Sequence, residues 1–452
     1  MKYLNVIFII LIATVVLLLP ALYNGYPYIY SDTGTYIYSG FEGKVPIDRP
    51  LTYGLFVRHS SLASSLWFTV FAQALLASSL IWLMIDAIFK SVRCKTRVYI
   101  ISIVMLSLFS SLTWFTTFIM ADHFSALAYL LLFLLMYIPV RNKIIFLASS
   151  LTYLFFTSMH LTNAPGHLFI LIVLVICKLL IPAFKHFFSW NQIRIGYFVV
   201  LLNFVFTPTI HWLFSGEFVT TKAGHLFITA RNVENGSLKA YLDDNCENKA
   251  YRLCNYKDSL PQAGSDFLWK SESPLYRLGG WEKNAEEYKA INTNILLTPK
   301  YLQLFFSYYC QTILYQLILH KVGCEFIPFG KETPPGWEIA NHFKEEENAF
   351  LAARQCQGKL DAPFNILNMV YLIFGILSFI IIIYLLITGK SRPLSSAFAF
   401  CTLLYYFGNM LVVSIASAGS RYNTRIEWLL LFSAILIITE TASYRNKTAK
   451  AG

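Results

Sequence analysis

Ten apolar segments, each of roughly 17–25 residues, recur along this chain of 452 residues. An α-helix of that length is what the hydrocarbon core of a bilayer requires. Hydrophobic residues make up 56% of the chain and charged residues only 13%, with a mean hydropathy of +0.54, which excludes an ordinary soluble domain. The sequence therefore predicts an all-α polytopic membrane protein, with helices near 4–23, 64–89, 98–119, 123–140, 144–161, 165–183, 195–214, 363–387, 395–417 and 426–442.

The net charge of +11 is a signal of topology rather than of nucleic-acid binding. Residues 215–362 carry 16 basic and 18 acidic residues, whereas the rest of the chain carries 20 basic and 7 acidic ones. Basic residues follow every second apolar segment, so we expect both termini in the cytoplasm. We also expect the first segment to be a retained anchor, because no small-residue cleavage site follows it. The expected location is a bacterial cytoplasmic (inner) membrane, with the large loop in the periplasm.

This topology divides the chain into three parts. Residues 1–214 form an expected N-terminal bundle of seven helices with an outer loop at 24–63, and residues 363–452 form a C-terminal bundle of three. Between them, residues 215–362 are expected to form a mixed outer domain in the periplasm. The apolar stretch 301–320 is expected to be an interfacial or packing helix that begins at Thr298–Pro299. If it crossed the membrane as an eleventh span, the basic residues after it would lie outside, against the preference of basic loops for the cytoplasm.

Cysteine usage agrees with an oxidising outer compartment. Five of the eight cysteines lie in the outer segment, and Cys246 and Cys254 flank the short loop "CENKAYRLC". We predict a disulfide between these two and a second bridge between Cys324 and Cys356. Zinc is the alternative, but the segment contains no CxxC pair with histidines at ligand spacing.

Three aspartates are expected to reach the outer face from different segments: Asp32 in "SDTGT", Asp48 in "PIDRPLTYG" and Asp122 in "FIMADHF". Acidic residues near the membrane are costly and often functional. Each also has a structural alternative. Asp32 could form an Asx turn, Asp122 could cap its helix, and Asp48 could pair with Arg49 or Arg58.

Basic and histidine side chains complete the candidate site. Arg421 and Arg425 lie in "SAGSRYNTRIEWLL", before the last helix, and arginine suits bidentate binding of a phosphate. Anchoring at the membrane interface is the alternative for both. The outer histidines are His123, His160 and His167, which could bind phosphate or sugar or simply be buried. A divalent cation held by Asp32, Asp122 and His123 is a further alternative.

The pattern of these residues resembles the GT-C glycosyltransferases, which include the bacterial aminoarabinose transferase and the protein mannosyltransferases. Asp32 matches the acidic residue of the first outer loop, and Asp122 matches the acidic residue at the start of the fourth span. Arg421–Tyr422 matches a basic element near the last outer turn, and "DRPLTYGLF" resembles the stretch that follows the first acidic residue. The similarity covers mainly the first 140 and the last 40 residues. The first loop departs from the family in having no DE or DxD pair.

The resemblance implies a sugar donor linked to polyprenyl phosphate and a lipid, glycan or protein acceptor, within membrane lipids. It implies Asp32 and Asp122 as catalytic residues, with Asp32 as general base and Asp122 orienting the acceptor or sharing that role. Substrate-binding roles are then expected for Asp48, Arg49, His123, His160, Arg421, Tyr422 and Arg425.

Two other classes of function remain alternatives from the sequence. A transporter or flippase of lipid-linked sugars would use ten spans and intramembrane acids, but such proteins usually have repeated halves and interrupted helices. A membrane acyltransferase would need a buried histidine or nucleophile, for which His160 is the candidate. The chain contains no P-loop, GxGxxG, GxSxG or HExxH motif, so nucleotide-driven transport and the standard hydrolases lack support.

Overall fold

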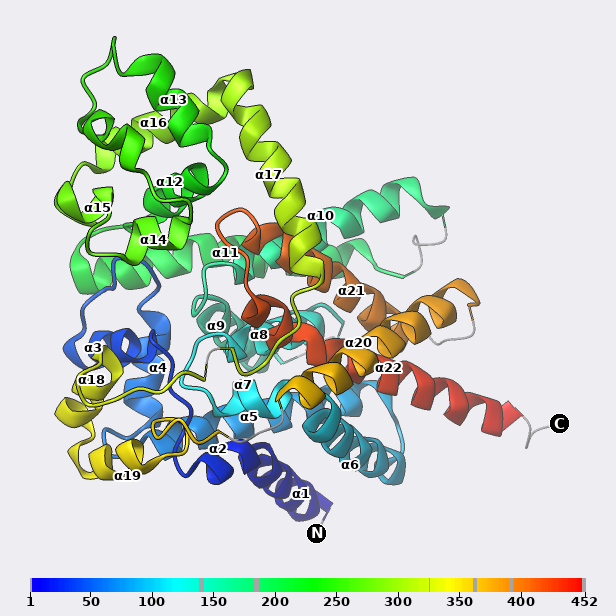
Figure 1. Ribbon diagram of the computed structural model, residues 1–452. Coiled ribbons are helices and arrows are strands. Elements are labelled where there is room, and N and C mark those ends of the chain that lie inside the picture. Colours follow the sequence, from blue (N-terminus) through cyan, green and yellow to red (C-terminus); the bar gives the residue numbers. More distant parts are fainter. Residues whose placement is uncertain are drawn as a thin grey trace.

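The computed structural model describes residues 2–137, 142–182, 187–324, 326–360, 364–389 and 393–448. These residues are almost all in helices and connecting turns, and none of them forms a β-strand (Figure 1). The mixed outer domain predicted for residues 215–362 is therefore wrong, because its described residues are helical. The sequence pattern failed there because most of the described helices of this segment have nine residues or fewer, which leaves too few turns for a clear helical period.

Among the described residues, six helices are long and apolar enough to cross a membrane, and they coincide with six of the ten predicted spans. The protein is therefore a multi-pass membrane protein by helix length and hydropathy. Three further predicted spans correspond to shorter apolar helices. The six are α5 (Leu66–Ile88), α10 (Asn163–Leu180), α11 (Trp190–Ser215), α20 (Phe364–Ile387), α21 (Pro393–Val413) and α22 (Ser420–Thr448); the three shorter ones are α1 (Lys2–Leu17), α8 (His123–Tyr137) and α9 (Lys143–Thr157).

Two predicted spans are interrupted rather than continuous. The first divides into α1 and α2 (Leu19–Asn24) at Leu18, where Pro20 occupies the first turn of the new helix and lacks an N–H for a continuous helix. The span predicted at 98–119 divides into α6 (Val92–Phe109) and α7 (Leu112–Thr117). Ser110 has extended backbone at this break. The second break brings residues 117–122 back toward the first outer loop.

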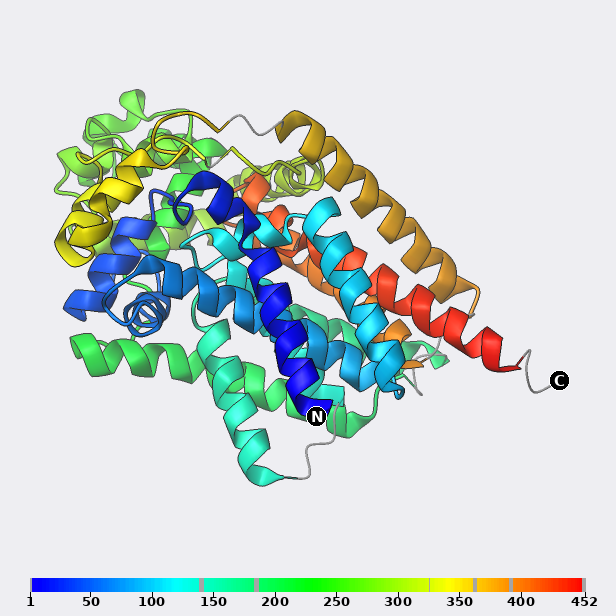
Figure 2. The ribbon, with the colours of Figure 1, turned by 90° about the horizontal axis from the view of Figure 1, so that it is seen from below.

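The spanning helices share one large apolar core, to which α1, α5, α8 and α22 all contribute. The last three helices pack together, α22 lying against both α20 and α21 (Figure 2). Residues of the 322–353 segment also join this core, including Val322, Phe326 and Phe350. The proposed division of the chain at 214/215 stays a prediction, and the boundary at 362/363 falls partly outside the described residues.

On the left of Figure 1, short helices gather at one end of the helical bundle. Helix α3 crosses α4 at Gly40 and Gly54, where a Cβ on either glycine would overlap the other chain segment. A Cβ on Gly34 would meet the backbone of Pro334, so α18 also packs closely on α3. These elements are α3 (Thr33–Glu42), α4 (Thr52–Ser60), α18 (Pro334–His342), the 3₁₀ helix η3 (Lys344–Glu346) and α19 (Glu347–Ala352).

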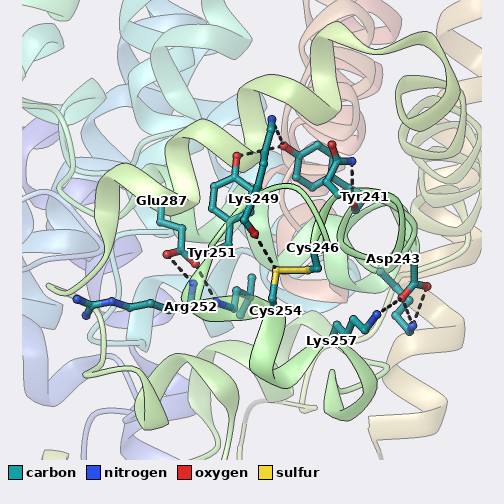
Figure 3. Close-up of a disulfide and its surroundings, with 12 residues drawn as sticks. Tyr241, Asp243, Cys246, Lys249, Tyr251, Arg252, Cys254, Lys257 and Glu287 are labelled. Carbon is teal, nitrogen blue, oxygen red and sulfur yellow. Dashed lines mark hydrogen bonds and ion pairs between the residues drawn. A yellow bond between two sulfur atoms is a disulfide. The ribbon is translucent and has the colours of Figure 1, made fainter.

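A second apolar core belongs to the outer segment and includes Leu226, Leu242 and Ile291. The predicted disulfide between Cys246 and Cys254 is confirmed (Figure 3). It joins the end of α13 (Ser237–Asn245) to the 3₁₀ helix η2 (Arg252–Ser259), which contains Cys254. Glu287 fixes the same region by accepting hydrogen bonds from the N–H groups of Arg252 (3.0 Å) and Leu253 (2.9 Å). The helices are α12 (Gly224–Glu234), α13 (Ser237–Asn245), η2 (Arg252–Ser259), α14 (Gly264–Trp269), α15 (Pro274–Arg277) and α16 (Ala285–Leu297).

The other predicted bridge is not present. Cys356 carries a free thiol, and no disulfide joins it to Cys324. The prediction rested on both cysteines being in the outer segment. Two cysteines in the same segment need not lie close in space, and a disulfide needs Cα atoms about 4.4–6.8 Å apart.

Helix α17 (Pro299–Leu317) follows α16 and begins at Thr298 with proline in its first turn, as predicted. It is absent from the helices that meet the length and hydropathy of a span. Many of its apolar side chains are exposed, whereas Thr312 and Gln316 are buried. Figure 1 shows α17 running across the direction of α20 and α22, an arrangement that fits a packing helix at the outer ends of the spans.

Replacing Cys246 or Cys254 with serine should destabilise the outer helical segment by about 2–3 kcal/mol, because the bridge closes a short loop in the unfolded chain. Thermal unfolding with and without reductant would measure this loss, and membrane insertion should be unchanged. Full alkylation of both thiols in the native, unreduced protein would show that the bridge does not form.

Candidate functional site

The first outer loop is fixed to the break between α7 and α8 by backbone bonds. Tyr28 pairs with Phe118 in an isolated bridge, donating to the carbonyl of Thr117 at 3.0 Å and accepting from Ile119 N–H at 3.0 Å. The Thr33 hydroxyl donates to the carbonyl of Ile119 at 3.0 Å. Because Asp32 directly precedes Thr33 and Asp122 follows Ile119 by three residues, these bonds bring the two aspartates into one region.

Asp32 is held by arginines rather than by its own turn. Its Oδ2 lies 2.8 Å from Arg49 Nη1 and 3.5 Å from Arg421 Nη1. Arg49 also pairs with Asp48, with Nη2 at 2.6 Å and Nε at 3.1 Å from the carboxylate. The Asp32 side chain makes no capping bond to α3, so the Asx-turn alternative is not formed. Asp48 pairs with Arg49, as its structural alternative expected.

Asp122 and Arg425 form a buried ion pair, with Arg425 Nη1 3.0 Å from Asp122 Oδ1 and exposed side-chain fractions of 0% and 2%. The same Nη1 donates to His160 Nε2 at 3.1 Å, and Nη2 donates to Thr162 Oγ1 at 2.8 Å and to Asn409 Oδ1 at 2.7 Å. Both terminal nitrogens of Arg425 thus have partners, which come from α21 and from the starts of α8 and α10, whereas its buried Nε has no hydrogen-bond partner among the described residues. Its geometry suits a residue that holds Asp122 in place.

Asp122 Oδ2 is different, because it is buried and accepts no hydrogen bond from any described residue. The carboxylate therefore does not cap α8. A buried oxygen without a donor is uncommon in folded proteins and calls for a water or ligand partner.

Arg421 is the least satisfied of the site's three arginines. Its Nη2 donates to the Tyr422 hydroxyl at 3.3 Å, whereas its buried Nη1 makes no hydrogen bond to the described residues beyond the 3.5 Å ion pair with Asp32. The guanidinium stacks over Tyr30 at 4.9 Å and Tyr422 at 5.1 Å from the ring centres. Stacking leaves the edge of the guanidinium, which carries its N–H donors, available to an anion.

The charges of these groups determine their protonation. Burial would raise the pKa of Asp32, but Arg49 and Arg421 together outweigh burial, and the pKa is lowered. Burial also opposes ionisation of Asp122, yet Arg421 and Arg425 lower its pKa to about 2. Burial, assisted by Arg425, lowers the pKa of His160 to about 3, so the imidazole is neutral and its Nε2 can accept from Arg425. Arg421 thus helps to lower the pKa of both Asp32 and Asp122.

A small pocket opens beside this cluster, with about 240 Å³ of atom-free space, part of it open to solvent. The wall is aromatic and apolar apart from two charged residues, and its lining residues are Tyr30, Phe115, Phe118, Met120, Asp122 and Arg421.

Some candidate residues lie elsewhere. His123 is turned toward α5, where its Nε2 is 3.2 Å from the carbonyl oxygen of Gln73. Arg58 donates to the carbonyl of Phe41 at 2.7 Å and stabilises the end of α3. His167 contacts the Tyr153 hydroxyl at 2.9 Å. Within the described ranges, no group of three or more His, Cys, Asp or Glu residues is placed to hold a metal ion, and Asp32 and Asp122 are instead surrounded by arginines.

Three partners in the cluster were absent from the sequence prediction: Thr162, Asn409 and Tyr30. Asn409 is a buried amide in α21, and a polar residue within an apolar span is the signal that could have singled it out. Thr162 and Tyr30 lie in loops rich in similar residues and carry no comparable signal.

Comparison with known proteins adds no assignment: no family model, no curated protein and no solved structure matches this chain. The likeness to the GT-C enzymes therefore rests on the residues quoted above, and the role of each site residue stays a prediction.

The site should make the stability of the protein depend on pH. His160 titrates near 6.5 in the unfolded chain but near 3 when folded, and Asp122 near 3.8 and 2, so the unfolded state binds more protons in both windows. Stability should fall as the pH drops below about 6.5, by up to about 1.4 kcal/mol per pH unit for each group, and more steeply below about 4.

Denaturant unfolding in detergent between pH 8 and 3 would measure this dependence. His160→Gln should reduce the loss between pH 6 and 4 without abolishing it, because His123 and His167 are buried as well. A variant of the exposed His59 should leave the profile unchanged. Identical profiles for the protein and His160→Gln would mean that His160 is not buried as a neutral imidazole.

Proposed function

We propose that this protein is a glycosyltransferase similar to the GT-C enzymes. It moves a sugar from a polyprenyl-phosphate-linked donor to a lipid, glycan or protein acceptor at the outer face of a bacterial cytoplasmic membrane. The observation that carries the proposal is the pocket shared by Asp122 and Arg421. Asp122 Oδ2 and Arg421 Nη1 have no hydrogen-bond partner among the described residues, so the pocket offers both an acceptor for a hydroxyl and a cation for a phosphate.

The proposed reaction uses these groups in one displacement. An acceptor hydroxyl oxygen forms a bond to the anomeric carbon while the bond from that carbon to the phosphate oxygen breaks. The hydroxyl proton passes to Asp32, with Asp122 orienting the acceptor or sharing the proton transfer. The polyprenyl phosphate leaves with its charge stabilised by Arg421. Direct displacement inverts the configuration at the anomeric carbon.

The balance of charges in the cluster supports a link between binding of the donor phosphate and removal of the acceptor proton. Three carboxylates face three guanidiniums in the cluster, and His160 is neutral. A donor phosphate bound to Arg421 would cancel part of the positive charge that lowers the pKa of Asp32 and Asp122. Their pKa values would rise, so each carboxylate would become a better base once the donor is in place.

The position of the cluster favours transfer over transport. Its residues lie in connecting segments or at helix starts, as with Asp32 before α3, Asp122 before α8 and Arg421 in the first turn of α22. A transporter usually binds its substrate near the middle of the membrane between interrupted helices. A site at helix ends suits a reaction at the membrane surface.

The orientation of the chain can be tested separately. Single cysteines at 250–290 should react with a membrane-impermeant maleimide in intact cells, whereas cysteines at 91–97 should react only after permeabilisation, because basic loops stay inside. Protection of 250–290 in intact cells would place Asp32 and the pocket on the cytoplasmic side and exclude an outer-face reaction.

Asp32→Asn should lower turnover on the order of a hundredfold or more, because the amide keeps the shape of the side chain but cannot accept the proton. Asp122→Asn should also be impaired and Asp48→Asn less so, and Arg421→Gln should slow release of the phosphate leaving group. Envelope glycans and lipid-linked sugars of a deletion strain, complemented with each variant, would identify the missing product, and release of polyprenyl phosphate in membranes would give the rate.

Asp86→Asn is a matched control, because Asp86 is an exposed carboxylate of α5 that pairs with Lys95, outside the cluster. Normal turnover by a well-expressed Asp32→Asn protein would rule out Asp32 as the base. A glycan profile unchanged by deletion would contradict the transferase proposal as a whole.

A further inference from the structure

We infer that Gln316 of the outer helix α17 is a positioning residue for Arg421. It holds the α21–α22 turn, defined as residues 414–423, in the conformation that presents the Arg421 guanidinium to the pocket. This inference assigns a role to the outer helical segment, and it rests on the proposed function in so far as Arg421 binds a phosphate.

Gln316 is fully buried and bonds to the turn with both ends of its amide. Its Nε2 donates to the carbonyl of Gly419 at 2.9 Å, and its Oε1 accepts from Gly419 N–H at 3.0 Å. The same Nε2 donates to Asn423 Oδ1 at 2.9 Å, and Asn423 Nδ2 returns a bond of 2.5 Å to the Gln316 carbonyl. These bonds flank Arg421 two residues away on each side.

Arg231 makes a second attachment between the outer segment and the same turn. It lies in α12, is buried, and donates from Nη2 to the carbonyl of Ser414 at 2.9 Å and to the hydroxyl of Thr312 in α17. Its charge is balanced by Glu234 at 2.7 Å. The start of the turn is thus tied to the same two outer helices whose core is separate from that of the spans.

Arg421 needs this external support because its own side chain has few fixed bonds. Arg49 and Arg425 are each held by two or more short bonds to carboxylates, imidazole or amides, whereas Arg421 relies on ring stacking, one 3.3 Å bond and a 3.5 Å ion pair. Its location is therefore set largely by the backbone of the turn. A site gains affinity when its charged groups are already held in position before the ligand binds.

Gln316→Leu removes the three side-chain bonds with little change in volume and keeps the bond from Asn423 to the backbone carbonyl, and Gln311→Leu makes the same change at an exposed position of α17. Amide hydrogen exchange of peptides covering 414–423 should become about tenfold faster or more in Gln316→Leu and stay unchanged in Gln311→Leu. Titration with a short-chain polyprenyl phosphate should give a Kd about tenfold higher for Gln316→Leu, with the number of binding sites per folded protein unchanged.

A merely structural role would lower the number of binding sites but leave the Kd of the folded fraction as it was. That result, or exchange in the turn equal to that of Gln311→Leu, would overturn the positioning role. Arg421→Gln in the same titration tests the proposed function on its own. If that variant binds polyprenyl phosphate normally, the phosphate role of Arg421 fails, whereas the exchange data still decide whether Gln316 holds the turn.

Discussion

The buried ion pair of Asp122 and Arg425 is the interaction on which the end of the bundle that carries the candidate site depends. It joins the start of α8 to α22, 303 positions apart in the chain. Two charges so far from water are costly unless every donor and acceptor is used. The two terminal nitrogens of Arg425 find partners in His160, Thr162 and Asn409, so the ends of four helices must meet in one arrangement. Arg425 Nε and Asp122 Oδ2 have no hydrogen-bond partner in the described structure. His160 is neutral because it is buried beside the positive charge of Arg425 and accepts a hydrogen bond from it.

Because Arg425 and Arg49 make several short contacts with the protein and Arg421 makes few, the three arginines of the cluster have different roles. Those two hold the carboxylates, whereas Arg421 lines the pocket. Each of the three has one buried nitrogen without a hydrogen-bond partner in the described structure, and that of Arg421 is Nη1. Asp122 keeps one such oxygen. A cluster of equal numbers of opposite charges could have been fully self-compensating. The pairing instead leaves one donor and one acceptor beside an apolar pocket, and this asymmetry is the basis of the proposed chemistry.

The outer segment contacts this cluster from two sides. Residues 221–223 bind the carbonyl of Ile47, two positions before Arg49, with bonds of 3.0 and 3.1 Å. Gln316 and Arg231 hold the α21–α22 turn. The helices of the outer segment, which form their own apolar core, therefore fix the backbone next to Arg49 and Arg421. A segment without membrane spans thus contributes to a site whose lining comes from the membrane bundle and its loops.

The sequence alone determined the features that depend on local composition. Segment length and hydropathy gave the membrane helices, Thr298–Pro299 gave the start of α17, and the spacing of Cys246 and Cys254 gave the disulfide. It also singled out Asp32, Asp122, Arg421 and Arg425, because charges are few in an apolar chain. Only the tertiary structure decided which arginine pairs with which carboxylate, that His123 is turned away, that Cys324 and Cys356 do not bond, and that Gln316 reaches the turn. The physical reason is that helix formation follows neighbouring residues, whereas pairing of buried polar groups depends on contacts hundreds of residues apart that no local pattern records.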